Sequence, residues 1–259
     1  MYYSKEIQRM TTDDGYFETY SAFRRHSTFD EVFPAAINKL SSELNLDSVK
    51  SCLTFGPGDG QYEVHFIKQC VPNITKLMAV EPDHESAERL RARLEKSLPG
   101  VDSQVIETTV QSWKGLGDPV DLVLMMHVLY FVSASERKEL FKELHEQWLT
   151  TGGRVVVVSA SRTKCTGSAH EILARLGTPL VSWEDIETDI VEAGFTKQHA
   201  HEITEMRDFS NLDEPFLRFY QKHVDQPVML DDIRNVIKEL FADGSSDQLF
   251  RMFAVFQKA

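Results

Sequence analysis

Three glycines at alternate positions follow a short apolar segment and precede a helical pattern, and no other feature of this sequence limits its fold as strongly. Residues 51–63 read S-C-L-T-F-G-P-G-D-G-Q-Y-E, with Gly56, Gly58 and Gly60 in the middle. A turn of this kind needs residues that adopt positive φ, and a ligand can approach its backbone because glycine has no Cβ. The pattern predicts a strand, a tight glycine turn and a helix N-terminus that together cradle a nucleotide-like ligand.

An acidic residue stands where this cradle needs one. A second short strand over residues 76–80 ends at Glu81, 21 residues after Gly60, where a carboxylate can accept hydrogen bonds from both hydroxyls of a ribose. The spacing is G-x-G-x-G rather than the G-x-G-x-x-G of NAD-binding folds, although a dehydrogenase could place the same acid on a ribose. The tighter spacing resembles the first motif of S-adenosylmethionine-dependent methyltransferases of the Rossmann-like class.

Composition narrows the choice of partners. The net charge of −12 argues against nucleic acid, because binding phosphates requires clustered cations, and it suits a small or cationic substrate. No apolar run approaches the roughly 20 residues of a membrane helix, and residues 1–10 lack the pattern of a secretory signal. The three cysteines, Cys52, Cys70 and Cys165, contain no C-x-x-C pair and predict neither a disulfide framework nor a metal site. We expect a cytoplasmic monomer.

The remaining segments predict one α/β domain over residues 1–259. It would have an N-terminal helical lid over 1–45, a cofactor-binding half over 46–160 and a substrate-side half over 161–259. In the lid, residues 11–14 are typical of a helix start, and Ser27 or Thr28 can cap a second helix that runs through residues 36–44. Further helices are expected over 83–97, 133–148, 182–193, 211–223 and 230–241, and strands over 51–55, 76–80, 101–107, 122–126, 154–159, 195–203 and 249–256.

This order predicts a Rossmann-like, mainly parallel seven-stranded sheet with helices on both faces and helical additions at the N-terminus and before the last strand. Ligands of such sheets lie at the carboxyl ends of the strands. The fourth strand ends there with His127, followed by Tyr130 and Phe131, so His127 is the catalytic candidate. Trp113 could stack on a base or belong to the core.

The three polar residues His199, His201 and Glu202 are close enough in sequence to suggest a metal cluster. Alternate residues of a strand also share a face for structural reasons, and no third strong ligand accompanies the two histidines. We therefore predict no metal.

A family resemblance rests on several segments together. The glycine turn, V-E-P after the second strand, M-x-x-L-Y-F after the fourth, the G-x-x-V-V-V-V-S strand and the upstream G-Y-F-E and F-R-R-H-S-T segments resemble the histamine N-methyltransferase family over about residues 10–160. The resemblance implies methyl transfer from S-adenosylmethionine to a small-molecule amine or imidazole. It implies that the glycines hold the methionine moiety of the cofactor and that Glu81 holds its ribose. Met126 would contact the cofactor through its backbone, and Ser86 and Gln111 or Ser112 would lie at the adenine end.

On the substrate side, the resemblance implies an aromatic pocket that includes Tyr16, Tyr20, Tyr130 and Phe131. Here the chain departs from the family. The carboxylate expected directly after H-S-T is Phe29, followed by Asp30 and Glu31; the glutamine expected at the end of the fourth strand is His127; and the asparagine expected in the last strand falls near Phe250 or Arg251.

These departures leave the substrate open. His127 could hold a substrate N–H or act as a base, and Arg251 would suit a substrate carboxylate. The alternatives to an amine or imidazole are therefore N- or O-methylation of a carboxylated small molecule, or a non-catalytic protein that keeps the cofactor site.

Overall fold

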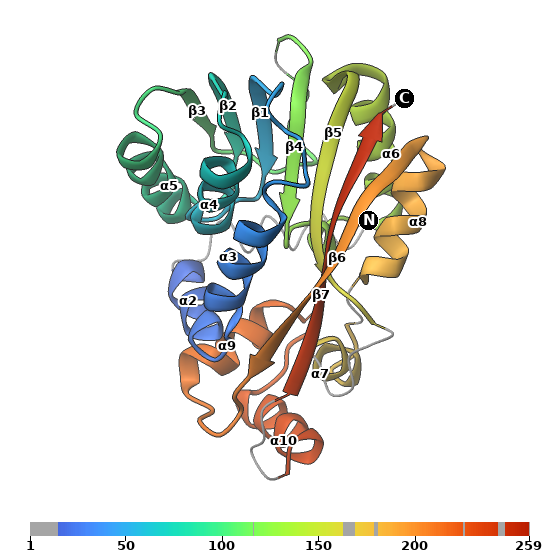
Figure 1. Cartoon of the computed structure of the whole chain (residues 1–259). Coiled ribbons are helices and arrows are strands. Elements are labelled where there is room, and N and C mark those ends of the chain that lie inside the picture. Colours follow the sequence, from blue (N-terminus) through green and yellow to red (C-terminus); the bar gives the residue numbers. More distant parts are fainter. Residues whose placement is uncertain are drawn as a thin grey trace.

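A seven-stranded sheet forms the centre of the molecule (Figure 1). The computed structural model describes residues 15–115, 117–162, 169–178, 181–224, 226–242 and 247–258. The strand order is β3-β2-β1-β4-β5-β7-β6, and β7 is antiparallel to both of its neighbours, whereas the other pairs are parallel. The strands are β1 (Ser51–Phe55), β2 (Lys76–Val80), β3 (Asp102–Ile106), β4 (Val120–Met126), β5 (Leu149–Ala160), β6 (Phe195–Arg207) and β7 (Asp247–Lys258).

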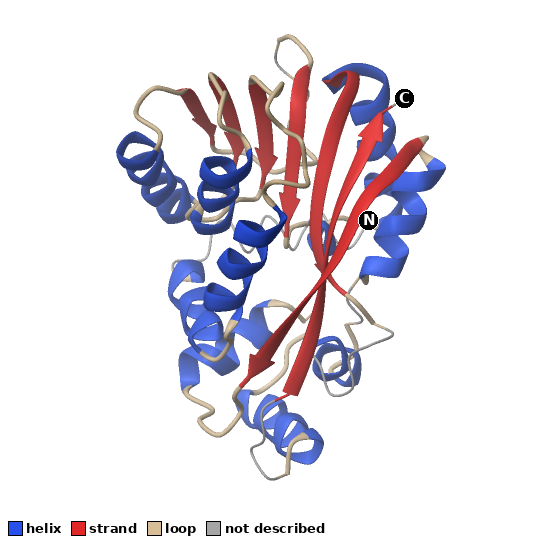
Figure 2. Ribbon diagram, viewed as in Figure 1, coloured by secondary structure: helices blue, strands red, loops and turns tan. Residues whose placement is uncertain are grey.

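Helices cover both faces of the sheet and also lie beyond its carboxyl ends (Figure 2). One face is covered by α3 (Phe29–Leu40), α4 (Gln61–Cys70) and α5 (His84–Ser97). The other is covered by α6 (Ala134–Glu143) and α8 (Trp183–Glu192). Beyond the strand ends lie α2 (Tyr16–Arg25), α7 (Ala169–Arg175), α9 (Glu214–Lys222) and α10 (Leu230–Leu240). The predicted fold class is confirmed, including the helices between the last two strands. None of the described helices is long and apolar enough to cross a lipid bilayer.

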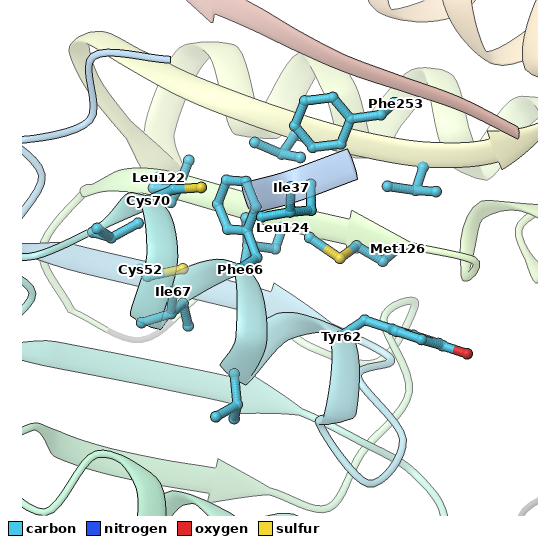
Figure 3. Close-up of a cluster of buried hydrophobic side chains, with 14 of the residues drawn as sticks. Ile37, Cys52, Tyr62, Phe66, Ile67, Cys70, Leu122, Leu124, Met126 and Phe253 are labelled. Carbon is cyan, nitrogen blue, oxygen red and sulfur yellow. The ribbon is translucent and has the colours of Figure 1, made fainter. Parts of the chain in front are cut away.

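Side-chain alternation along the strands divides the core into two layers. On β4, Leu122, Leu124 and Met126 face the first set of helices, whereas Val123 and Met125 face the second. All five are buried, because both faces of a mostly parallel sheet are covered. Figure 3 shows the first layer, in which the Tyr62 hydroxyl points away from the apolar cluster.

Two expectations for the middle of the chain were wrong in detail. The T-T-G-G segment at 150–153 is a bulge inside β5 rather than a turn before it, because the partners of Val120 and Leu122 jump from Leu149 to Arg154. The helix expected to run to residue 148 ends as α6 at Glu143 and continues as a single π-helical turn over 144–148.

The H-S-T segment joins the N-terminal helices to the sheet. Thr28 precedes α3 as predicted, but its hydroxyl accepts the backbone N–H of Met206 instead of capping the helix. Ser27 bridges to Arg207, so the segment pairs with the exposed edge of β6. The helix ends at Leu40 rather than at 44. The helix start predicted over 11–14 lies outside the described residues.

Candidate active site

The glycine turn adopts a backbone that only glycine accepts easily. The φ angles of Gly56, Gly58 and Gly60 are 58°, 57° and 73°. A Cβ on Gly56 would lie 2.4 Å from Val128 Cγ2, and one on Gly60 would lie 2.3 Å from Leu90 Cδ1. A Cβ on Gly58 would meet nothing within 4 Å. The outer two glycines therefore allow close packing, and the middle one leaves open space in front of the backbone.

Glu81 is tied to this turn. Its Oε2 accepts the Gly58 N–H at 2.8 Å and its Oε1 accepts the Asp83 N–H at 3.0 Å. Burial raises the pKa of Glu81 to about 7, although both N–H donors act to lower it. The carboxyl group thus stands at the end of β2, next to the turn, as the sequence predicts.

A cleft opens between the glycine turn and the N-terminal helix, and we call it the glycine-turn cleft. It encloses about 850 Å³, its open mouth included, a size typical of ligand sites. The predicted residues that line it are Gly56, Gly58, Glu81, Ser86, Gln111 and Met126. The predicted aromatic residues Tyr16, Tyr20, Tyr130 and Phe131 also line it.

Polar atoms of this cleft that are buried without a hydrogen-bond partner include Gln111 Oε1 and Glu63 Oε2. The other end of the Gln111 amide donates to the Phe131 carbonyl at 3.3 Å, which fixes its direction. Burial raises the pKa of Glu63 well above its ordinary value. Because unpartnered buried acceptors are costly, both atoms favour a ligand that brings hydrogen-bond donors.

Three sequence candidates lie elsewhere. Gly60 is the N-cap of α4 and does not line the cleft. Ser112 is exposed, and its hydroxyl accepts from that of Thr109 at 3.0 Å. Trp113 belongs to the core, where its ring packs edge-on against Phe55 and Trp148. Of the residues expected at the adenine end, Ser86 and Gln111 line the cleft and Ser112 does not.

His127 is held in an unusual conformation at the end of β4. Its φ is +59°, rare for a side chain with a Cβ, and its backbone N–H donates to Val158 at 2.9 Å. The ring packs edge-on against Phe29 at 4.9 Å, and its Nε2 is buried without a partner. Burial, followed by the charge of Arg251, lowers the pKa of His127 to about 3. Strain at such a position is typical of functional sites.

A second cavity adjoins the first, and four side chains line both: Tyr20, Tyr62, His127 and Tyr130. We call it the arginine cavity. Its remaining walls include the predicted Phe29 and Arg251, with Glu205, Arg207, Phe219 and His223, which the sequence did not suggest. His127 thus lies at the junction of the two cavities.

The ionic part of the arginine cavity lies on β6 and β7. Glu205 Oε1 accepts from Arg251 at 2.6 and 3.0 Å and from Arg207 at 3.3 Å, and Oε2 accepts from the Ser27 hydroxyl at 2.7 Å. Burial raises the pKa of Glu205, but the charges of Arg251 and Arg207 outweigh this effect and hold it at about 2. Glu205 is therefore ionised at neutral pH.

The carboxylates that follow H-S-T do not reach this cavity. Asp30 accepts two hydrogen bonds from Arg24 Nη2 and one from the Tyr62 hydroxyl. Glu31 is exposed on α3. Neither lines a described cavity, whereas Phe29 does. Neither of these two carboxylates is therefore placed to bind a substrate ammonium group, and the carboxylate in the described lining of the cavity is that of Glu205, which pairs with Arg207 and Arg251.

Possible metal ligands lie away from both cavities. His84, Glu88 and Glu107 are the group in the described residues whose ligand atoms come within 4.8 Å of one another, and all three are exposed. Arg91 already pairs with both glutamates. His199 and His201 belong to no such group in the part of the chain that the structure describes.

The sequence contains one signal for Glu205 and Arg207, the two charged residues of the arginine cavity that the sequence analysis did not propose. Ile203, Glu205 and Arg207 occupy alternate positions of β6, and alternate positions share one face of a strand. When an apolar residue such as Ile203 is followed on the same strand face by two charged residues, the pattern indicates that these charged side chains are also buried. The expected strand ended at residue 203, so this pattern lay outside it.

The comparisons with known proteins agree with this geometry. Residues 52–153 match the family model described as a methyltransferase domain. No curated protein is similar enough in sequence to give a match. Solved structures with the same fold include the N-methyltransferase NodS from Bradyrhizobium japonicum WM9 with bound S-adenosyl-l-homocysteine, at 14% identity, a TM-score of 0.56 and coverage of 100% of this chain and 99% of NodS.

Two more solved structures extend the likeness. Magnesium protoporphyrin IX methyltransferase (ChlM) from Synechocystis PCC 6803, with bound S-adenosylhomocysteine, has 11% identity, a TM-score of 0.60 and full coverage of both chains, at 100% and 100%. Geranyl diphosphate methyltransferase in complex with S-adenosylmethionine has 17% identity, a TM-score of 0.54 and coverage of 96% of this chain and 92% of that one. At such identities the likeness shows a shared fold. The chain thus has the class I, Rossmann-like fold of these methyltransferases, with the methyltransferase-domain match over residues 52–153, and two of the neighbours hold S-adenosylhomocysteine.

Proposed function

We propose that this protein transfers the methyl group of S-adenosylmethionine to a nitrogen of a small imidazole-type compound bound in the arginine cavity. The observation that carries the proposal is His127, a buried neutral side chain with a free Nε2 at the junction of the two cavities. The resemblance to histamine N-methyltransferases implies an amine or imidazole as acceptor, and the geometry favours the ring nitrogen.

The residues of the glycine-turn cleft fit the cofactor. Glu81 would accept the ribose hydroxyls, and Gln111 Oε1 would accept from the adenine amino group, with Ser86 beside it. The open space in front of Gly58 would admit the methionine moiety. Glu63 Oε2, the other unpartnered acceptor, would meet one of the positive groups of the cofactor.

When bound, the cofactor supplies a methyl carbon made electrophilic by the positive sulfur. The work of the protein is then alignment. The lone pair of the unprotonated ring nitrogen forms the new N–C bond as the S–C bond breaks, and the proton of the other ring nitrogen leaves to solvent. His127 would hold a substrate N–H and so fix the tautomer, while Tyr20, Tyr62 and Tyr130 would close off water between the cavities.

An alkylamine is the weaker candidate for the acceptor. Its nitrogen is protonated at neutral pH, and a group with a pKa of about 3 such as His127 is a poor base for removing that proton. An imidazole nitrogen is largely neutral at pH 7, so it needs orientation but no base.

The test is detection by mass spectrometry of a product heavier by one CH₂ unit. The protein and S-adenosylmethionine are incubated with histamine, imidazole amino acids, imidazole dipeptides, other biogenic amines and catechols. We expect a methylated imidazole. Cofactor binding without methylation of any compound would instead indicate a non-catalytic protein.

A pair of variants tests His127 itself. His127→Ala should lower kcat at least about tenfold, or ~1.4 kcal/mol of transition-state stabilisation. His127→Gln, which restores a side chain that can hydrogen-bond, should recover part of this loss. An unchanged kcat in His127→Ala would reject the role of this residue.

A further inference from the structure

We propose that the substrate carries a carboxylate and that Arg207 and Arg251 bind it in the arginine cavity. This inference rests on the proposed function of the same site and specifies its substrate class. It would make the cavity selective for an imidazole with an acidic side chain rather than for one with an ammonium group such as histamine.

The charges of the cavity wall are unbalanced. Three guanidinium groups line it, those of Arg24, Arg207 and Arg251, and Glu205 is its one carboxylate among the described lining residues. Arg24 is already engaged, because it pairs with Asp30 at 2.8 Å and with Asp59 at 3.5 Å, both outside the cavity lining. Guanidinium groups thus outnumber carboxylates among the described residues of this lining.

This excess charge is buried. The side chains of Arg207 and Glu205 are each 1% exposed, and that of Arg251 is 12% exposed. Burial lowers the pKa of both cavity histidines, to about 3 for His127 and to about 4 for His223, although the hydrogen bond to the Phe219 carbonyl acts to raise the pKa of His223. Both histidines are therefore neutral at pH 7, so neither changes the net charge of the cavity wall. Because buried donors without an acceptor are costly and Arg207 has two such nitrogen atoms, the cavity favours a ligand that brings acceptor oxygens.

The hydrogen-bonding atoms point to the same ligand. Nε and Nη1 of Arg207 are buried and have no hydrogen-bond partner in the described part of the chain, although the Tyr220 hydroxyl lies near the guanidinium. The face of this guanidinium covers the Phe23 ring at 3.8 Å, so its edge remains for a ligand. The N–H groups of Nε and Nη1 lie on either side of Cδ and share no donor edge, so each can give its own charge-assisted hydrogen bond to a carboxylate oxygen.

The backbone explains how these groups come together. Beyond Ile203 and Arg251, which face each other, β7 has only β6 as a partner strand among the described residues, since β5 ends opposite Arg251, and the other edge of β6 is bridged by Ser27. This two-stranded extension carries Glu205 and Arg207 past the carboxyl ends of the other strands (Figure 1). On the same face, the apolar Phe253 and Val255 lie farther inside the sheet. The charged part of this face of β6 and β7 therefore begins where the hydrophobic core ends.

A binding experiment separates this inference from the proposed function. The protein loaded with S-adenosylhomocysteine is titrated in a calorimeter with imidazole-4-acetate, 4-methylimidazole and histamine, which differ in the charge of the side chain. We expect imidazole-4-acetate to bind at least about tenfold more tightly than either of the others, since hydrogen bonds between a guanidinium group and a carboxylate are stronger than neutral ones.

Variants of the two arginines test whether these residues cause the preference for imidazole-4-acetate. Arg251→Gln and Arg207→Gln should each weaken binding of imidazole-4-acetate at least about tenfold and leave 4-methylimidazole within about twofold. The matched control is Arg218→Gln on α9, which removes the same charge from an exposed arginine that lines neither cavity. It should change neither affinity. If a glutamine variant fails to fold, Arg251→Lys keeps the charge and loses the planar fork, and it should still weaken binding of the carboxylate.

Three results would overturn the inference. They are equal or better binding of histamine, no binding of imidazole-4-acetate by the loaded protein, and an unchanged preference in the arginine variants. None of these would refute methyl transfer itself, which would still be judged by product formation across the wider set of acceptors. Conversely, binding of imidazole-4-acetate without turnover would leave the inference intact and contradict the proposed function.

Discussion

At the scale of single residues, the glycines of the turn have separable roles. Gly58→Ala places a methyl group into the open cleft at a φ of 57°. We expect a loss of about 1 kcal/mol in unfolding free energy, because alanine is strained at positive φ, and at least a tenfold loss in affinity for S-adenosylhomocysteine, because the methyl group occupies ligand space. Chemical denaturation and calorimetry measure the two quantities.

Gly60→Ala is the matched control for this substitution. Its φ is 73°, but its Cβ would meet Leu90 inside the core and not the cleft. The unfolding free energy should fall further, by about 1–3 kcal/mol beyond the backbone strain. The folded fraction should bind the cofactor product nearly as well as the natural protein. Equal effects of the two substitutions on affinity would contradict this division of roles.

Glu81 should make cofactor binding depend on pH. Its pKa of about 7 in the cofactor-free protein means that it becomes fully ionised only above neutral pH, and the ionised form accepts ribose hydroxyls best. Affinity for S-adenosylhomocysteine should rise about tenfold between pH 6 and pH 8. Glu81→Gln should bind more weakly and lose this dependence. A dependence that persists in Glu81→Gln would show that another group causes it.

The same residue has the opposite effect on folding. Because the pKa of Glu81 is raised in the folded state, the folded protein holds a proton that the unfolded chain has released between about pH 4.5 and pH 7. The contribution of Glu81 to stability is therefore present below this window and is lost as the pH rises through it. Bound cofactor should offset this loss.

The sequence predicts the residues of the cleft better than those of the arginine cavity, for a physical reason. Gly58, Glu81 and Gln111 follow from a local strand, turn and helix, so their spacing along the chain nearly determines their positions. Arg207 and Glu205 meet Arg251 only through antiparallel pairing of strands about 45 residues apart. Nothing in a single sequence reports that pairing directly.

At the scale of elements, a buried ion pair connects two helices. Arg137 of α6 donates through Nε to Asp189 of α8 at 2.7 Å, and both side chains are buried. Asp189→Ala should lower the unfolding free energy by about 3–5 kcal/mol, because it leaves the guanidinium buried without a counter-ion. Urea denaturation measures the change.

Two further variants show how the loss of stability in Asp189→Ala should be interpreted. Lys138→Ala removes an exposed neighbour of Asp189 at 3.6 Å and should cost no more than about 1 kcal/mol. Replacing both Arg137 and Asp189 by methionine and leucine should recover most of the loss, because it removes the two charges together. A small effect of Asp189→Ala alone would show that the pair is not essential for packing these helices.

Some elements could not be predicted with the correct role. The H-S-T segment is a local signal for a helix cap, yet its side chains bind β6 and Glu205, which lie far away in the sequence. The T-T-G-G segment has the composition of a turn, but it is a bulge in β5 because its neighbours on both sides pair with β4. In both cases tertiary pairing overrides a local preference.

At the scale of the whole molecule, the site is formed by parts distant in the chain. The sheet supplies the glycine turn, Glu81 and His127. The N-terminal helix α2 and the late helix α9 pack together beyond the strand ends, with Phe23 stacked on Phe219 at 3.8 Å. The glycine turn thus belongs to the common fold, whereas the walls of the arginine cavity come largely from α2, α9 and the extended ends of β6 and β7.

The central claim is that the glycine-turn cleft and the arginine cavity act as one site for an anionic imidazole. The most direct measurement is a competition, in which the protein and S-adenosylmethionine are given imidazole-4-acetate and histamine at equal concentration and the two methylated products are quantified by mass spectrometry. The ratio of products reports the ratio of kcat/KM. We predict that methylated imidazole-4-acetate exceeds methylated histamine at least about tenfold. A product mixture dominated by methylated histamine, or no methylated imidazole at all, would contradict this account.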